Sequence, residues 1–342
     1  MLGAKTQAAA SGQPLPRRGI HRILVCHVSH TLGNTLLLTP LIAELQKVYP
    51  GAEIDVVTRS LVAQDIFGGF ERVRHIYSVP RHGVTAPQRI AGILSRLRER
   101  RYDLAIDPCV RSKSDRLYVM AAKATWKLGY ASNKGGELTH AVDVPSHLRH
   151  VGQLPVHLLR SALGQVEEDA YPPLDIRLSA DERAAGHRTL RDIAGGGGPI
   201  FGMFTSATGP KHLGAEWWRR FAAHAAATNP GVRFVEIIPL AGASMLDNAF
   251  PTFYSTDVRR LAAMLSGLSL FVGADGGVMH LACASGTPTV GLFRGTDVAE
   301  WGPYGPRDRA IDIGDRTPED IADVSLVLHA EHARRAHDLC VA

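Results

Sequence analysis

The sequence predicts an α/β protein made of two domains, each built around a parallel β-sheet. Short apolar runs alternate with segments of helical periodicity, a rhythm typical of sheets that helices cover on both faces. The chain has 342 residues, more than one hydrophobic core usually organises, and its hydrophobic content of 45% suffices for two cores. A break with two prolines at 169–173 separates the two series of strands.

The first domain is predicted over residues 21–172, behind a flexible tail at residues 1–20. Its apolar runs are bounded by turn residues such as Tyr49-Pro50-Gly51, which end one helix before the next strand begins. A turn is expected at Thr31–Thr35, directly after the first strand. The expected strands are 22–28, 52–58, 73–77 and 103–107, and the expected helices are 36–48 and 88–100.

The second domain is predicted over residues 173–316 and repeats the rhythm of the first without repeating its sequence. Residues 317–342 are expected to form a C-terminal helix that packs back towards the first domain. Because ligands of such sheets bind beyond the carboxyl ends of the strands, the reactive cleft is expected between the domains. The expected strands are 200–204, 234–238, 268–272 and 289–293.

The charge balance restricts the classes of partner. A net charge of +5 and a pI of about 9.1 suit nucleic acid, an anionic membrane or an anionic substrate, or reflect a solvated surface. Helix-turn-helix, zinc-finger and RNA-binding patterns are absent from the sequence, so no nucleic-acid partner is expected. Neither a membrane-spanning run nor the apolar region of a signal peptide is present, so a cytoplasmic location is expected.

The cysteines and histidines indicate no metal site. Cys26, Cys109, Cys283 and Cys340 are far apart and form no C-x-x-C pair. Thiols in a reducing cytoplasm are therefore expected instead of disulfides. The sixteen histidines are scattered, without metal-binding spacing beside carboxylates.

The most informative stretch runs from Phe271 to Gly305. An apolar run meets Asp275-Gly276-Gly277-Val278, then an apolar segment of small residues, then a second apolar run, which indicates strand, glycine turn, helix and strand. The turn places the backbone N–H groups of Gly276, Gly277 and Val278 at a helix N-terminus, where they can bind an anion such as a diphosphate. The alternative is that these glycines only make a tight turn.

Three motifs in this stretch carry a family resemblance. D-x-G-x-M-H-L-A at 275–282, G-x-P-T-V-x-L-F at 286–293 and W-G-P-Y-G at 301–305 resemble the nucleotide-sugar signature of the heptosyltransferases, glycosyltransferase family 9. The resemblance implies a GT-B fold, with two Rossmann-like domains whose parallel sheets face across a cleft. It also implies a metal-independent, inverting transfer of heptose or a related sugar from an ADP-linked donor to lipopolysaccharide or another saccharide acceptor. The nucleotide sugar is then a substrate, with no further cofactor.

The base position departs from the family. Ser29–Pro40 resembles the family's loop G-D-x-x-x-T-x-P, whose Asp is the proposed general base, but this chain has Asn34, and an amide cannot take a proton. A positioned base contributes about 10²–10⁴ in rate. Either His27, His30 or Asp107 substitutes, or the protein is a slow or catalytically impaired nucleotide-sugar-binding homologue. A substitute base is preferred because the donor site is otherwise intact; a simple turn at Gly33-Asn34 is the structural alternative.

The donor site is predicted from two further segments. Thr205–Trp218 resembles the family's loop after the first strand of the second domain, so Lys211 is expected to contact the donor diphosphate and stabilise the leaving group. Ser206 and Thr208 are expected to donate hydrogen bonds to the same oxygens. His280 is expected either to contact the donor or to be a packing residue of its helix.

The acceptor site is predicted in the first domain. By resemblance, Thr35 lies in the acceptor loop, Arg111 and Lys113 bind phosphate or carboxylate on an acidic sugar, and His150 occupies a frequent family histidine or caps a helix. Glu236 falls inside a strand instead of a glycine-rich turn, which leaves the identity of the donor open.

A basic amphipathic segment at 88–101 has apolar residues on one face and arginines on the other. It is either a surface helix packed on its own sheet or a contact to the anionic inner face of the membrane.

Overall fold

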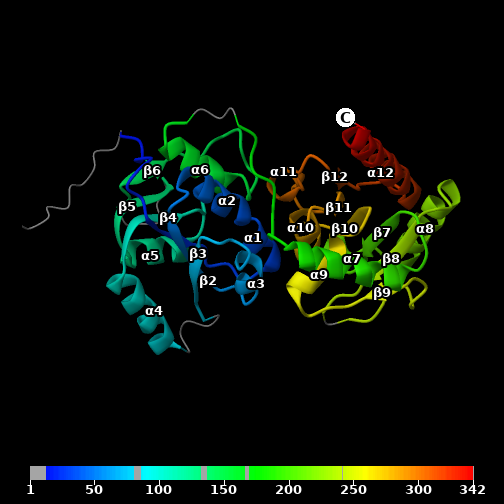
Figure 1. The fold of residues 1–342 in the computed structure, drawn as a ribbon, viewed down its shortest axis with the longest axis horizontal. Helices are drawn as coiled ribbons and strands as arrows, with labels where there is room; N and C mark the ends of the chain where they lie inside the picture. Colours follow the sequence, from blue (N-terminus) through cyan, green and yellow to red (C-terminus); the bar gives the residue numbers. More distant parts are fainter. Residues whose placement is uncertain (1–12, 81–85, 132–136, 166–168, 241, 342) are drawn as a thin grey trace, which may run out of the picture. The chain divides into compact units, whose positions relative to one another are not determined.

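The computed structural model describes residues 13–80, 86–131, 137–165, 169–240 and 242–341. The chain divides into two compact units, residues 1–172 and 173–342, each containing one parallel sheet (Figure 1). Of the tail predicted at 1–20, residues 1–12 lie outside the described residues. We call the two units the first and second domain.

The first domain is a six-stranded sheet in the order β3-β2-β1-β4-β5-β6, with every neighbouring pair parallel. The apolar strand β1 lies at its centre and buries four of its five residues. The strands are β1 (Arg22–Cys26), β2 (Glu53–Thr58), β3 (Val73–Ser78), β4 (Arg101–Asp107), β5 (Lys123–Tyr130) and β6 (His140–Val142). The helices are α1 (Leu32–Leu36), α2 (Thr39–Val48), α3 (Ala63–Phe67), α4 (Pro87–Glu99), α5 (Lys113–Ala121) and α6 (Leu154–Ala162).

The second domain has the same architecture, with the order β12-β11-β10-β7-β8-β9 and parallel pairing throughout. Strands β10 and β11, neither of them at an edge of the sheet, are buried along their whole length. The strands are β7 (Ile200–Phe204), β8 (Arg233–Ile237), β9 (Thr252–Phe253), β10 (Leu270–Ala274), β11 (Thr289–Phe293) and β12 (Arg309–Asp312). The helices are α7 (Ala180–Ala194), η2 (Gly209–Lys211, a 3₁₀ turn), α8 (Ala215–Thr228), α9 (Val258–Leu265), α10 (Gly277–Ala284), α11 (Val298–Trp301) and α12 (Pro318–Val341).

The segment after β1 differs from its prediction. The sequence predicts a turn at Thr31–Thr35 followed by one helix over 36–48. The structure has two helices instead, α1 and α2, and the chain between them forms a turn at Leu37 and Leu38. The cause is Pro40, which has no N–H for the carbonyl of Leu36 and whose ring collides with it in a continuous helix. The Thr39 hydroxyl donates to that carbonyl instead, at 2.7 Å. Asn34 therefore lies on a helical turn.

Helices α7 and α9 pack unusually closely in the second domain. A Cβ added to Gly186 of α7 would lie 2.1 Å from the backbone carbon and oxygen of Ala263 in α9, so only glycine fits. Beside this contact, Arg259 of α9 donates to both carboxylate oxygens of Glu182 in α7, at 2.5 and 2.7 Å. This ion pair holds the pKa of Glu182 down at about 2.

Arginines fix both ends of the chain segment that joins the domains. On the first side, Arg160 forms a buried ion pair with Glu44 at 2.8 Å and donates to the carbonyls of Asp169 and Ala170. On the second side, Arg259 donates to the carbonyls of Ile176 and Arg177. The connecting segment is thus attached to the first domain at residues 169 and 170 and to the second at residues 176 and 177.

Helix α12 contacts α8 and β10 of its own domain, and Arg220 of α8 forms an ion pair with Glu319 at 2.8 Å. The predicted packing of this helix towards the first domain stays a prediction.

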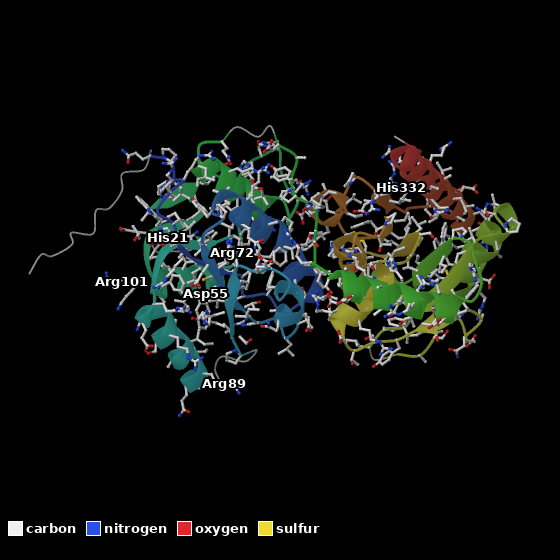
Figure 2. The ribbon with its side chains drawn as sticks, in the orientation of Figure 1. His21, Asp55, Arg72, Arg89, Arg101 and His332 are labelled. Carbon is white, nitrogen blue, oxygen red and sulfur yellow. The ribbon has the colours of Figure 1, made fainter. Side chains whose placement is uncertain are left out.

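Helix α4 packs its apolar face, with Ile93 and Leu97, into the first domain's core, while its arginines are exposed. At the C-terminal end of α4, Arg100 donates to Asp55 of β2, which also accepts from Tyr102 of β4. Asp55 is labelled in Figure 2. Within the described part of the chain, no helix combines the length and apolar character that crossing a bilayer requires.

Candidate functional site

An open helix N-terminus lies at the carboxyl end of β10. Asp275 follows the strand directly, Gly276 is the N-cap, and α10 begins at Gly277. Among the described residues no side chain caps this end. Because no helical turn precedes them, the first N–H groups of α10 also have no intrahelical acceptor, and Gly276, Gly277 and Val278 are partly exposed. This is the geometry predicted for an anion site.

Close packing holds α10 in this position. A Cβ on Gly291 of β11 would come within 2.5 Å of the Met279 sulfur, so the glycine allows the helix to lie directly on the sheet. Met279 is fully buried. Gly291 occupies the variable position of the motif V-x-L-F, and in this chain any larger residue there would displace the helix.

Lys211 reaches the same point from a different loop. It ends the 3₁₀ turn η2 after β7, and its Nζ lies 2.5 Å from Asp275 Oδ2 and 3.4 Å from the Asp275 carbonyl. Its side chain is 25% exposed, against 7% for Asp275, so the lysine is the more accessible member of this ion pair. An ammonium with three donors can hold Asp275 and a bound anion together.

His280 lies on the inner side of this site. It is 3% exposed, and its Nε2 is 4.0 Å from Asp275 Oδ1. Burial beside the carboxylate that Lys211 pairs with favours the packing role of His280, and its contact with the donor stays a prediction. Ser206 is half-buried and Thr208 exposed in the loop between β7 and η2.

Glu236 has a role that the sequence did not indicate. Its carboxylate is fully buried in β8, where it accepts from the Thr205 hydroxyl at 2.9 Å, from Ser244 Oγ at 2.5 Å and from the Met245 N–H at 3.0 Å. It therefore ties the start of the Lys211 loop to the segment after β8. The arrangement needs residues far apart in sequence, so strand periodicity alone could not reveal it.

The acceptor loop begins directly after β1. Asn34 donates from Nδ2 to Ser29 Oγ at 3.1 Å, and its N–H donates to the Thr31 hydroxyl that caps α1. Thr35 is 1% exposed and donates to the Thr31 carbonyl at 2.8 Å, so its hydroxyl serves the helix. Asn34 itself is half-buried.

The other predicted acceptor residues lie on different elements. Arg111 and Lys113 are exposed in the loop after β4 and at the start of α5, and because β4 pairs with β1 they follow the neighbouring strand end. His150 is buried and accepts the Gly152 N–H at Nδ1, 3.1 Å away, while its carbonyl accepts from Gln153 and Leu154. His150 thus shapes the turn that leads into α6.

Two of the three candidate substitute bases are buried. Asp107 is 0% exposed, accepts from Arg116 Nε at 2.8 Å and accepts the Cys109 N–H at 3.3 Å. His27 is 8% exposed, and burial lowers its pKa in spite of the nearby carboxylates of Asp115 and Asp107. His30 is exposed.

Comparison with known proteins decides the family. The family model described as glycosyltransferase family 9 (heptosyltransferase) matches residues 90–321, more than half of the chain. The chain belongs to glycosyltransferase family 9. It is an enzyme of the glycosyltransferase class, as the motifs at 275–305 predicted.

Relatives of this glycosyltransferase agree in sequence and in fold. Lipopolysaccharide heptosyltransferase 3 of Escherichia coli (strain K12) is 25% identical over 314 residues, which cover 80% of this chain and 82% of the relative. A glycosyltransferase of family 9 from Veillonella parvula superposes with a TM-score of 0.75 at 17% identity, covering 91% of this chain and 97% of its own. The structure of E. coli heptosyltransferase WaaC with ADP superposes with a TM-score of 0.69 at 18% identity, covering 90% of this chain and 99% of its own. The predicted GT-B fold is confirmed.

Proposed function

We propose that this glycosyltransferase moves a heptose or related sugar from an ADP-linked nucleotide sugar to a saccharide of lipopolysaccharide or another cell-surface glycan. The observation that carries the proposal is the site in the second domain, where the open N-terminus of α10 and the Lys211 ammonium converge beside Asp275. Membership of the family supplies the reaction class. The heptose and the lipopolysaccharide acceptor are taken from the E. coli relative.

The chemistry proposed for this site is leaving-group stabilisation. The acceptor hydroxyl attacks the anomeric carbon, with inversion, as the bond from that carbon to the diphosphate breaks. Negative charge then grows on the departing nucleoside diphosphate, where the N–H groups of Gly277 and Val278 and the Lys211 ammonium stabilise it. These cationic and dipolar groups take the place of a divalent ion in binding the diphosphate.

The direct test measures ADP release from ADP-heptose in the presence of a heptose-deficient lipopolysaccharide core, together with calorimetric titration of ADP in EDTA. We expect binding without a divalent ion and transfer that depends on the acceptor. Strict dependence of ADP binding on Mg²⁺ or Mn²⁺ would contradict the proposed donor site.

Lys211→Met is expected to weaken ADP binding by about 1.5–3 kcal/mol, because the variant loses a charge-assisted hydrogen bond to the diphosphate. Calorimetry measures the change. Since the substitution also leaves Asp275 unpaired, the matched control is Lys211→Met combined with Asp275→Asn. Recovery of wild-type affinity in the double variant would mean that Lys211 only neutralises Asp275.

Asn34→Asp is expected to raise the rate of transfer by about tenfold or more, since a well-placed base contributes about 10²–10⁴. The burial of His27 and Asp107 favours this outcome over the substitute base that the sequence suggested, and leaves the exposed His30 as the remaining candidate for such a base. Asn34→Ala and His30→Ala are the matched variants, with kcat measured on the true donor and acceptor. A collapse of kcat in His30→Ala, with no gain in Asn34→Asp, would identify His30 as the base.

The alternative function is a nucleotide-sugar-binding homologue with impaired transfer. Asn34 favours it, because an amide stands at the base position. Tight ADP-heptose binding without ADP release, for the wild type and for Asn34→Asp, is the result that would support it.

The proposed location is the cytoplasmic face of the inner membrane, where a glycolipid acceptor is accessible. The exposed arginines of α4 favour peripheral contact with anionic lipid. Sedimentation with anionic and neutral vesicles tests this contact.

A further inference from the structure

We propose that the first domain contains a binding site for one divalent transition-metal ion, with Zn²⁺ as the best fit, formed by His27, Cys109 and Asp115. His27 directly follows β1, Cys109 follows β4, and Asp115 lies in the first turn of α5. One ligand atom from each residue, an imidazole nitrogen, a sulfur and a carboxylate oxygen, lies within 4.8 Å of the other two. This site is independent of the proposed function, and nothing in the sequence pattern predicted it.

The spacing of the donor atoms fits zinc. His27 Nδ1 and Cys109 Sγ are 3.5 Å apart. A Zn–N bond of about 2.0–2.1 Å and a Zn–S bond of about 2.3 Å at the tetrahedral angle place nitrogen and sulfur about 3.5 Å apart. Nitrogen, sulfur and oxygen together form a donor set that Zn²⁺ accepts, whereas Mg²⁺ and Ca²⁺ require oxygen ligands.

The carboxylate is already oriented. Asp115 Oδ1 accepts the Val28 N–H at 2.9 Å, and the Asp115 N–H donates to Ser112 Oγ at 3.3 Å. Outer hydrogen bonds of this kind fix a metal ligand in position. Asp115 is 1% exposed, so its side chain has little freedom to lose on binding.

His27 lacks the contacts that normally accompany burial. The residue is 8% exposed, and its Nε2 has no hydrogen-bond partner among the described residues. The only hydrogen-bond contact at Nδ1 in that part of the chain is the one to Cys109, and sulfur is a weak partner. Buried polar groups are usually satisfied, and at Nδ1 a metal bond would replace this weak contact with a stronger one.

The local charge also balances. Arg116 neutralises the neighbouring Asp107 in a fully buried ion pair, which leaves Asp115 as the nearby carboxylate for a cation. A Cys109 thiolate and the Asp115 carboxylate carry two negative charges, equal and opposite to those of one divalent ion. Three protein ligands leave a fourth tetrahedral position for water or another oxygen ligand.

The test uses the full-length protein, stripped of metal with a chelator and titrated with Co²⁺ and with Zn²⁺. We expect one equivalent to bind, tetrahedral Co²⁺ visible bands with a thiolate-to-cobalt charge-transfer band, and a raised Tm with Zn²⁺. Cys109→Ser should lower Zn²⁺ affinity by on the order of a hundredfold and abolish the charge-transfer band, since loss of a second-shell partner alone costs about 10–100-fold. His27→Gln and Asp115→Asn should weaken binding similarly.

Cys283→Ser is the matched control, because Cys283 is a buried cysteine in the second domain and its loss should leave binding unchanged. Asp115→Asn keeps an acceptor oxygen for the Val28 N–H, so this variant replaces Cys109→Ser as the test of metal binding if Cys109→Ser does not fold. The absence of stoichiometric binding in the wild type, or an unchanged Co²⁺ spectrum in folded Cys109→Ser, would overturn the proposal.

Discussion

Gly186→Ala is expected to destabilise the protein by about 3 kcal/mol or more, because the new methyl group would collide with backbone atoms. The Cβ would lie 2.1 Å from the Ala263 carbonyl, and neither α7 nor α9 can relieve the contact by a side-chain rotation. The helices must separate, which would also strain the ion pair of Glu182 with Arg259. Urea unfolding followed by circular dichroism measures the change in the free energy of unfolding.

Gly92→Ala is the matched control for this prediction. Gly92 also lies inside a helix, α4, but a Cβ at this position meets no atom within 4 Å. Alanine at position 92 is expected to stabilise the protein by about 0.5–1 kcal/mol, through its higher helix propensity alone. Equal effects of the two substitutions would show that α7 and α9 tolerate a wider separation than the structure has.

Asp107→Asn is expected to cost about 3–5 kcal/mol of stability, because it leaves the buried Arg116 guanidinium without its charge partner. The side chains of Asp107 and Arg116 are 0% and 4% exposed. The same variant separates two roles of Asp107: a structural partner predicts loss of stability, whereas a general base predicts loss of kcat in a stable protein. Thermal unfolding and kcat are measured on the same preparation.

Asp169→Asn is the control for the ion pair. It removes the partner of Lys47 at the surface, where the two side chains are 65% and 72% exposed, and the expected cost is under about 1 kcal/mol. If Asp107→Asn were as harmless as Asp169→Asn, water or another group would have to compensate Arg116.

Local sequence patterns were sufficient for the central strands and for the donor turn. The strands at Ile200–Phe204 and Thr289–Phe293 have the predicted bounds, because short buried runs bounded by glycine and proline have few alternative structures. The helix start at Gly277 followed from the glycine turn in the same way. The break between α1 and α2 was missed, although Pro40 was visible, because the apolar spacing continues across it.

The candidate site was less accessible to sequence reasoning where it depends on contacts between distant elements. The pairing of Lys211 with Asp275 joins positions 64 residues apart, and the Glu236 network joins three segments. The cluster of His27, Cys109 and Asp115 has no recognisable spacing, since the proximity of its members comes from the pairing of β1 with β4. The roles of Asn34, Arg111 and Lys113 in acceptor binding stay predictions.

The arginine attachments on either side of the domain boundary limit where a protease can cut. Arg160 holds the backbone at Asp169 and Ala170, and Arg259 holds it at Ile176 and Arg177, with residues 171–175 between these two attachments. Two of those five residues, Pro172 and Pro173, have fixed φ angles and resist most endoproteases. The folded enzyme should therefore resist a protease of broad specificity, such as proteinase K, at residues 171–175, even though its sequence there has the composition of a linker.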